Sequence, residues 1–434
     1  MDPLLLALFG FVVMLLLIAL HVPIGIAMAI CGVVGFAQIV GWGPALSLMA
    51  SEPAATMANL ELAVIPLFIL MGSLASVGGL ATDIFDMAAT LVGHRRGGLA
   101  MTTVVASGGF GAICGSSVAT AATFGRVAMP EMSSRGYSMD IAAGAVAAGG
   151  TLGIIVPPSA IMILYCVLTE QSVLAVFTAA IIPAFITIVF YVLAVRLSVW
   201  RDADSAPAGD RVPWKDRWKA LLIGWRVIVL AVAVLGGIYS GVFTVQEAAS
   251  VGVVLAFLFA LFRGKLTWKS FASVLAEASS STAMIYIMIF GATIFSYFIA
   301  VTGGAEFLVG AVGQLSIPPI AVIFLFLVVY LILGAFFDEV ASIVITLPFV
   351  VPVIQHFGYD LVWWGVINTT VVGIAMLTPP IGINVMVLNA MYKDIPLRTI
   401  YRGVIPFVGV DLVRLTLLTI FPQITLWLPH LLGK

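Results

Sequence analysis

Charged residues are scarce in this sequence of 434 residues: only 9% are Asp, Glu, Lys or Arg, while 62% are hydrophobic. Soluble globular domains carry roughly 25% charged residues, so the composition excludes a soluble protein. The mean hydropathy of +1.20 supports the same conclusion. A membrane helix takes roughly 20 apolar residues, which leaves room for about a dozen helical passes. Because the alternating pattern of a β-barrel is absent, we expect an all-α polytopic membrane protein.

Motifs for chemistry are absent as well. The net charge is −1, without an extended basic patch, so no nucleic-acid partner is expected. The histidines and cysteines lie far apart, with neither HExxH nor a zinc spacing. Walker A, Ser-x-x-Lys and Gly-x-Ser-x-Gly patterns are missing too. We therefore expect no enzyme and no cofactor. An intramembrane hydrolase with Ser117 as nucleophile stays open only if a distant histidine reaches that hydroxyl.

Basic residues are confined to a few loops. None precedes Arg95, and none lies between Lys269 and Lys393. Loops rich in Lys and Arg stay on the cytoplasmic side of a membrane. This rule places three loops there: 196–219, 263–269 and 393–402.

Two apolar segments are each divided by a small or polar cluster into arms of about 15 residues, too short to span a bilayer singly. The first covers 99–130 around "CGSS", and the second covers 319–353 around "FFDE". Short arms joined at a polar tip are typical of re-entrant hairpins, which occur where protein or a water-filled cavity surrounds the irregular backbone. The flanking basic residues predict that the first hairpin begins and ends in the cytoplasm and the second outside.

A long apolar segment with a double proline follows each hairpin. The segment 140–169 contains "VPPS", and the segment 361–391 contains "TPPI". Consecutive prolines remove backbone donors and open a helix, so two discontinuous helices are predicted. Freed carbonyls can coordinate a cation, and the amino end of the next half-helix attracts an anion. Side-chain oxygens suited to Na⁺ lie nearby, at Ser116, Ser117, Ser159, Thr378, Asn384 and Asn389.

A simpler alternative exists for these features. The prolines would then only kink the helices, and the small residues would only allow close helix packing. The recurrence of both features in each half of the chain favours a binding site over packing alone.

The two halves of the sequence repeat each other. Landmarks recur with a constant shift of 222 positions, including Pro130 with Pro352, "GY" at 136–137 with "GY" at 358–359, and the two double prolines. The same shift aligns Ser116 with Asp338. We infer an internal duplication. Because the hairpins enter from opposite sides, the repeat is inverted, which is typical of secondary transporters.

Three charged residues fall inside the predicted hairpins. Asp338 and Glu339 lie at the second tip, where a charge near the bilayer centre costs at least about 2.5 kcal/mol and is usually functional or paired. The alternative is a tip that reaches a solvated cavity. Arg126 could attract a substrate carboxylate, or its side chain could extend toward the cytoplasmic interface near Glu131.

Four stretches together resemble the large membrane subunit of TRAP (tripartite ATP-independent periplasmic) transporters. They are "GGFGAICGSSVATAATFGRVAMPEM" (108–132), "GGTLGIIVPPSAIMILYCVLTEQSV" (149–173), "GAFFDEVASIVITLPFVVPVIQHFGYD" (334–360) and "GIAMLTPPIGINVMVLNAM" (373–391). Weaker likeness, as in "IPLFILMGSLASVGGL" (65–80), extends over nearly the whole chain.

The resemblance implies an inverted-repeat, elevator-type transporter in a bacterial inner membrane. A transport domain with both hairpins and both broken helices would slide against a scaffold domain. It implies N-terminal scaffold helices at 1–61, the first half of the transport domain at 62–172, scaffold helices with a cytoplasmic connector (196–219) at 173–278, the second half of the transport domain at 279–392 and a C-terminal helix at 393–434.

The resemblance also implies partners. Such subunits typically use a Na⁺ gradient and import small carboxylates that a periplasmic substrate-binding protein delivers. They work with a small membrane subunit, which we expect to be a separate protein here. The alternative is a stand-alone elevator-type carboxylate symporter that couples to Na⁺ or to protons.

Functional residues can be carried over from the resemblance. The first Na⁺ site would use Gly115, Ser116, Ser117, Gly153, Val156 and Pro157. The second would use Gly334, Asp338, Thr378, Pro379 and Gly382. The substrate would lie near Ser117, Asp338, Asn384 and Arg126, and Na⁺ would be the only metal. Arg126 and Glu339 depart from the family pattern, the first as a large charged residue and the second as an additional acid.

Overall fold

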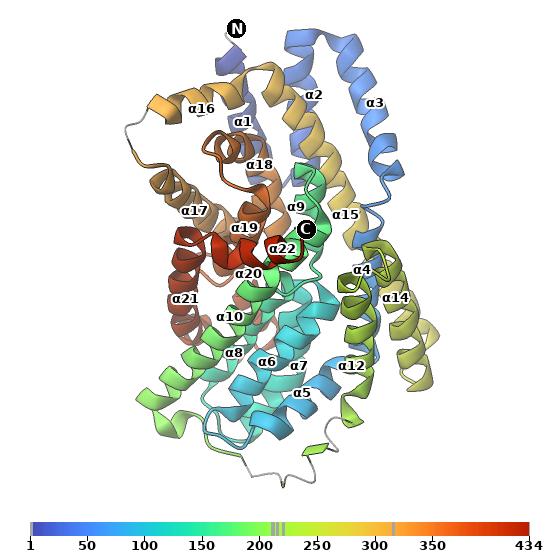
Figure 1. The fold of residues 1–434 in the computed structure, drawn as a ribbon, viewed down its shortest axis with the longest axis vertical. Coiled ribbons are helices and arrows are strands. Elements are labelled where there is room, and N and C mark those ends of the chain that lie inside the picture. The colour runs from blue at the N-terminus through green and yellow to red at the C-terminus, as the bar shows by residue number, and fades with distance from the viewer. Residues whose placement is uncertain (1–2, 210–212, 214–216, 219–221, 315–316, 434) are drawn as a thin grey trace.

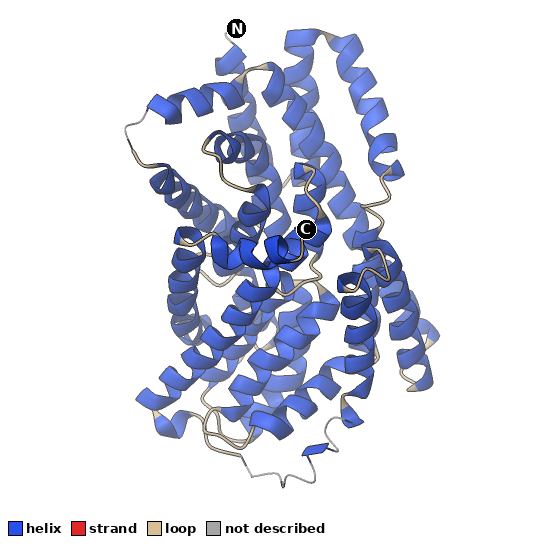
Figure 2. Ribbon diagram, viewed as in Figure 1, coloured by secondary structure: helices blue, strands red, loops and turns tan. Residues whose placement is uncertain are grey.

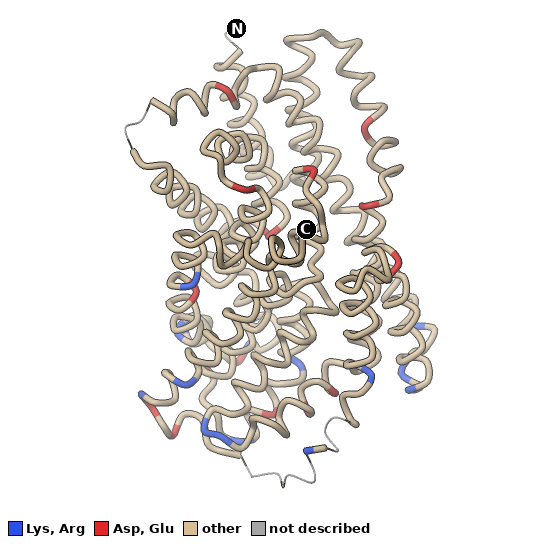
Figure 3. The backbone as a smooth tube through the Cα atoms, in the orientation of Figure 1, with Lys and Arg blue, Asp and Glu red and all other residues tan. Residues whose placement is uncertain are grey.

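The computed structural model describes residues 3–209, 213, 217–218, 222–314 and 317–433, and every regular element in these residues is a helix (Figures 1 and 2). Within these described residues, seven helices are long and apolar enough to cross a membrane, or eight if one bent pair counts as a span. Lys and Arg gather toward one end of the molecule, which is the cytoplasmic end (Figure 3). The chain is therefore a multi-pass membrane protein.

The two predicted hairpins and the two discontinuous helices are confirmed. The first repeat consists of α6 (Gly98–Cys114), α7 (Ser117–Ser134), α8 (Met139–Ile155) and α9 (Ala160–Thr169). The second consists of α17 (Pro319–Phe336), α18 (Glu339–His356), α19 (Leu361–Ala375) and α20 (Ile383–Met391). A shift of 222 positions superimposes α7 on α18 at both ends. Both double prolines contain a cis peptide bond.

The repeat is inverted in space. The arms of the first hairpin, α6 and α7, lie toward the basic end of the molecule in Figure 1, whereas α17 and α18 lie toward the other end. The tips of both hairpins therefore meet near the middle of the molecule. Each hairpin packs against the broken helix of its own repeat, α6 and α7 on α8 and α17 and α18 on α19.

A second group of helices packs along one side of these repeats. It contains α1 (Pro3–Ala19), α2 (Ile24–Val40), α3 (Trp42–Ala58), α4 (Val64–Val77), α14 (Val245–Phe262) and α15 (Trp268–Val301). The longest is α15, which lies along α2 and also contacts α4. The chain then bends by 66° between α4 and α5 (Leu80–Val92), and α5 packs against α6 of the first hairpin.

The bend between α4 and α5 is held by a partly buried ion pair. Arg263 donates to both carboxylate oxygens of Asp83, at 2.6 and 2.7 Å, and to the carbonyls of Gly78 and Gly79. Asp83 lies in the first turn of α5, and Arg263 follows α14. The bend is thus fixed to the second group of helices.

The remaining helices complete the fold. They are α10 (Val173–Arg201), η1 (Ala203–Ser205), α12 (Trp225–Ala231), a π-helical turn η2 (Val232–Gly236), α13 (Gly237–Tyr239), α16 (Gly304–Gln314), α21 (Leu397–Ile420) and α22 (Gln423–Leu431). The predicted division into scaffold and transport domains stays a prediction. In the packing, α10 lies mainly against α21 and α22, and it also contacts α6, α8 and α19 rather than α14 or α15.

Several elements differ from the expectation. The sequence did not predict α3, α5 or α16, because their mixed composition carries no long apolar run. The segment expected from 279 is one helix from Trp268 to Val301, since a capping box at Thr267 starts it earlier. The C-terminal helix expected over 393–434 is two helices, α21 and α22. Part of the connector at 196–219 lies outside the described residues, and α10 continues into it as far as Arg201.

The crossing of α8 and α21 depends on glycine. A Cβ on Gly403 would lie 2.0 Å from the Asp140 carbonyl oxygen, and one on Gly144 would lie 2.2 Å from the Gly403 oxygen. We predict that Gly403→Ala lowers the melting temperature, because overpacking costs about 1–3 kcal/mol. Gly409→Ala on the same helix is the matched control, since no atom lies within 4 Å of its Cβ. Equal melting temperatures for the two variants would contradict this packing.

Candidate functional site

The first hairpin turns at Gly115 and Ser116. α6 ends at Cys114, and Gly115 continues with a φ of 64°, a left-handed conformation that glycine adopts without strain. Ser116 then caps α7, and its hydroxyl accepts a hydrogen bond from the Ala119 amide at 3.4 Å. The Ser116 carbonyl accepts one from the Thr120 hydroxyl at 2.7 Å. The tip therefore presents the amino end of α7.

The second hairpin has the same kind of helix cap 222 positions later, but Phe337, at the position of Gly115, is extended rather than left-handed. Asp338 caps α18, and its carboxylate accepts from the Ala341 amide at 2.7 Å. The Asp338 carbonyl accepts from the Ser342 hydroxyl at 2.8 Å. Asp338 thus has the role of Ser116 with a negative charge added. The Oε2 atom of Glu339 beside it is buried and has no hydrogen-bond partner in the described part of the chain.

The first tip lies against the first helix break. A Cβ on Gly153 would lie 2.4 Å from the Ser116 carbonyl oxygen, so the last turn of α8 is in backbone contact with the tip. A Cβ on Gly115 would meet the backbone of the break at 3.3 Å. Val156 and Pro157 follow next in the chain. The structure therefore brings together the backbone residues predicted for the first cation site.

Oxygen atoms at the first break are available for a ligand. Ser159 is fully buried, and its hydroxyl has no hydrogen-bond partner among the described residues. No hydrogen bond within that part of the chain reaches the carbonyls of residues 156–158. Unpaired oxygens in an apolar interior are costly, so the break is suited to a bound cation or an ordered water.

The second tip contacts the second helix break. A Cβ on Gly334 would lie 2.6 Å from the Cβ of Ala375. The Ile381 amide donates to the Ala335 carbonyl at 3.3 Å, and the Thr378 hydroxyl donates to the Ala375 carbonyl at 3.0 Å. These contacts gather most of the residues predicted for the second cation site, namely Gly334, Thr378, Pro379 and Gly382.

Ser117 and Asn384 bond to each other behind the first tip. The Asn384 amide donates to the Ser117 hydroxyl at 2.8 Å and to the Ala147 carbonyl at 3.1 Å, and all of these groups are buried. The contact joins α7 and α8 of the first repeat to α20 of the second. Ser117 has an amide as its partner rather than the histidine that a hydrolase would require.

A cavity of about 540 Å³ lies between the two tips and the helices α4 and α15. Residues at the amino ends of four helices line it, those of α7, α9, α18 and α20. Helix amino ends carry partial positive charge and unpaired N–H groups. Charged and hydroxyl side chains complete the lining: Arg126, Glu277, Asp338, Glu339, Ser73, Ser76, Ser116, Thr123 and Ser281. The cavity is therefore polar, with helix amino ends and one arginine set beside three acidic side chains, and it can hold a small polar molecule.

The predicted substrate residues divide into two groups. Arg126 and Asp338 line the cavity, whereas Ser117 and Asn384 lie in the wall behind it. The sequence reasoning missed Glu277 and the hydroxyls of α4 and α15. A signal was present, because Glu277 and the serines after it interrupt an otherwise apolar 34-residue helix.

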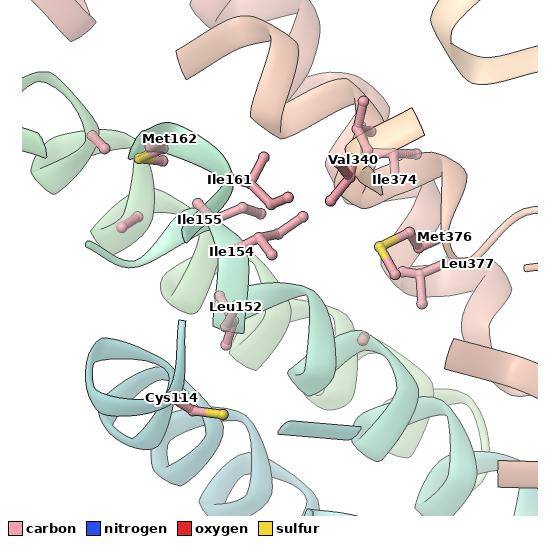
Figure 4. Close-up of a cluster of buried hydrophobic side chains, with 14 of the residues drawn as sticks. Cys114, Leu152, Ile154, Ile155, Ile161, Met162, Val340, Ile374, Met376 and Leu377 are labelled. Carbon is pink, nitrogen blue, oxygen red and sulfur yellow. The ribbon is translucent and has the colours of Figure 1, made fainter. Parts of the chain in front are cut away.

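The inner wall between the two breaks is apolar. Figure 4 shows Ile154, Ile155 and Ile161 of the first repeat facing Ile374 and Met376 of the second. Buried aliphatic side chains at this depth keep water from passing between the breaks. The polar cavity is thus closed on this side.

A second cavity lies nearer the other end of the molecule. Its volume is about 590 Å³, and residues of α3, α9, α15 and α18 line it, including Glu52 and Glu170. It lies between the C-terminal half of α15 and α18 of the second hairpin, which also touch each other through Phe295 and Phe349. No group of three His, Cys, Asp or Glu side chains suited to a metal occurs in the described residues. A cation at the tips would therefore depend on carbonyl and hydroxyl oxygens, together with the single Asp338 carboxylate at the second tip.

Comparison with known proteins gives a consistent family. Residues 11–424 match the family described as "Tripartite ATP-independent periplasmic transporter, DctM component". The chain is 34% identical to the C4-dicarboxylate TRAP transporter large permease protein DctM of Pseudomonas aeruginosa, over 87% of this chain and 88% of that protein. It is 32% identical to the sialic acid TRAP transporter large permease protein SiaM of Vibrio cholerae, over 89% and 90%.

The name of a third relative specifies a different compound. The ectoine/5-hydroxyectoine TRAP transporter large permease protein UehC of Ruegeria pomeroyi is 30% identical over 97% of this chain and 98% of that protein. Among solved structures, the YdaH transporter of Alcanivorax borkumensis has the same fold, with a TM-score of 0.61 and 15% identity over 98% of each chain.

The bond between Ser117 and Asn384 generates a test of this geometry. We predict that Asn384→Ala lowers the free energy of unfolding by about 1–3 kcal/mol, because it leaves the buried Ser117 hydroxyl and Ala147 carbonyl without their partner. Thermal unfolding in detergent measures the effect. Asn389→Ala on the same helix is the control, since Asn389 is only half-buried. Similar losses in both variants would show that the contact between the repeats is not what stabilises this region.

Proposed function

The chain belongs to the DctM component family of tripartite ATP-independent periplasmic transporters, and from this premise we propose a Na⁺-coupled permease that imports a small carboxylate by an elevator mechanism. The permease role in the uptake of organic acids follows from the family. The proposal concerns the coupling ion (Na⁺), the elevator mechanism and the substrate class (a small carboxylate).

One observation carries the proposal: two hairpin tips and two helix breaks surround a single cavity. The amino ends of four helices border this cavity, and Arg126 adds a full positive charge. Such an arrangement attracts an anionic group through partial charges and free N–H donors. A carboxylate bound there would contact both repeats at once, so its binding would depend on how the tips are placed.

Two features support Na⁺ as the coupling ion. The first break offers an unpaired Ser159 hydroxyl and free carbonyls beside the Ser116 tip. The second tip offers the Asp338 carboxylate next to a break with the Thr378 hydroxyl. Hard oxygen ligands of this kind suit Na⁺, and a cation at each tip would offset the charge of an anionic substrate.

The two cavities support alternating access. The cavity at the tips contains Arg126 and Glu277, which lie toward the cytoplasmic ends of α7 and α15. The other cavity lies between α15 and the outer half of α18. Movement of the hairpins and broken helices along α15 would close one cavity as it opens the other. This is alternating access by an elevator mechanism.

The proposed partners and substrate class are inferred from the names of the related proteins. We propose that a small TRAP membrane subunit and a periplasmic substrate-binding protein act with this chain. The relatives' names specify C4-dicarboxylates, sialic acid and ectoine, all of which carry a carboxylate. The isethionate in the name of another relative carries a sulfonate instead, so an anionic group is the shared chemistry that the cavity has to recognise.

Reconstitution tests the proposed function. Liposomes with the chain, its small subunit and the binding protein should take up the carboxylate only with an inward Na⁺ gradient. Omission of the binding protein should abolish uptake. Uptake that persists without Na⁺ would contradict the coupling, and uptake by the chain alone would favour a stand-alone symporter.

The first tip gives a sharper prediction. Ser116→Ala combined with Ser117→Ala should raise the Na⁺ concentration for half-maximal uptake roughly tenfold, because each lost hydroxyl interaction is worth about 0.5–1.5 kcal/mol. Ser279→Ala combined with Ser280→Ala is the control, since both serines are exposed on α15. An unchanged Na⁺ dependence in the Ser116/Ser117 variant would remove the first tip from the site.

A further inference from the structure

A buried polar network connects α21, α10 and α8. Arg414 and Asp411 of α21 form an ion pair at 2.9 Å, and neither side chain is exposed. The Tyr191 hydroxyl of α10 donates to the other Asp411 oxygen at 2.5 Å. Because that hydroxyl gives its proton to Asp411, it accepts from the Thr151 hydroxyl of α8 at 2.8 Å. Thr151 can donate the same proton to the Ala148 carbonyl, also at 2.8 Å. Arg414 also donates to Thr187.

This network contains charged groups, whose burial in a membrane protein costs free energy. Each charge within the bilayer costs at least about 2.5 kcal/mol on insertion scales. Apolar residues of similar volume would often hold the same helices together at least as firmly. Helix packing alone therefore gives no reason for the ion pair, because Gly403 and Gly144 already bring α21 and α8 into backbone contact.

The end of the network lies beside the first helix break. Thr151 occupies the last turn of α8, two residues before Gly153. Gly153 in turn contacts the Ser116 carbonyl of the first tip. The Asn384 amide holds α8 from a neighbouring face through the Ala147 carbonyl. The C-terminal part of α8 is thus held at two positions, at Ala147 by Asn384 and at Thr151 by the network.

We propose that Asp411, Tyr191 and Thr151 are positioning residues for the cation site at the first tip. The ion pair with Arg414 orients the Asp411 carboxylate, and the carboxylate orients the Tyr191 hydroxyl. Tyr191 then holds Thr151, and with it the carbonyls that follow Gly153. The inference rests on the proposed Na⁺ coupling and adds a remote set of residues that sets the Na⁺ affinity.

The competing explanation is a purely structural anchor of α21 on α10. That role needs Arg414, Asp411, Tyr191 and Thr187, but it does not need the Thr151 hydroxyl. Thr151 therefore separates the two explanations. Thr151→Val removes the hydroxyl at constant shape, and Thr151→Ser keeps it.

The test measures how Na⁺ shifts the melting temperature of the full chain, purified with any membrane subunit that accompanies it. NaCl is titrated against KCl at constant ionic strength. Thr151→Val and Tyr191→Phe should each raise the Na⁺ concentration for half the shift about fivefold, the equivalent of one hydrogen bond of about 1 kcal/mol. Thr151→Ser should match the parent. The double variant should resemble either single one, because both changes break the same chain of bonds.

Tyr239→Phe is the matched control. Its hydroxyl donates to the Phe177 carbonyl outside the network, so its loss should leave the Na⁺ response unchanged. A parent shift that is unaltered in Thr151→Val, even where melting in KCl falls, would overturn this inference and leave Na⁺ coupling intact. A parent protein with no difference between NaCl and KCl would overturn the proposed coupling, and this inference with it.

Discussion

The need to satisfy backbone groups within the bilayer is the constraint on which the rest of the structure depends. Both broken helices end in the interior, at Ile155 and at Ala375, and both hairpins turn there. Exposed N–H and C=O groups cannot face hydrocarbon, so protein or water must surround each end. The fold meets this requirement at the tips and at the first break by placing them against one another, whereas Pro379, Pro380 and Ile381 of the second break are exposed. The cavity with its four helix amino ends is a consequence of that arrangement.

The two repeats satisfy the backbone groups at their helix breaks with different residues. This difference affects what each tip can bind. At the second break the Tyr401 hydroxyl donates to the carbonyls of Pro380 and Ile381, at 3.1 and 2.8 Å. At the first break the carbonyls receive no such donor among the described residues. Ser116 contributes a hydroxyl group, whereas Asp338 contributes a carboxyl group. One site therefore offers unpaired oxygens and the other a carboxylate, so we expect the two tips to differ in cation affinity.

The sequence could predict the repeats because their signals are local or periodic. Double prolines, polar tips and a constant shift of 222 positions are visible in the chain, and α18 lies where that shift places it. The bonds between distant residues left no such signal. Nothing in the sequence pairs Ser117 with Asn384, which lie 267 positions apart, or Tyr191 with Asp411. Glu277 was visible as an acid within an apolar helix, but only the packing places it at the cavity.

The most direct test of the central claim is hydrogen–deuterium exchange of the purified protein in Na⁺ and in K⁺. Cations held by the tips and breaks would order the backbone around them, so Na⁺ should slow exchange at residues 115–118, 153–156, 337–340 and 376–383. Exposed segments such as α16 should exchange equally in both salts. Equal exchange at both tips in Na⁺ and K⁺, in a protein whose uptake still requires Na⁺, would contradict the account.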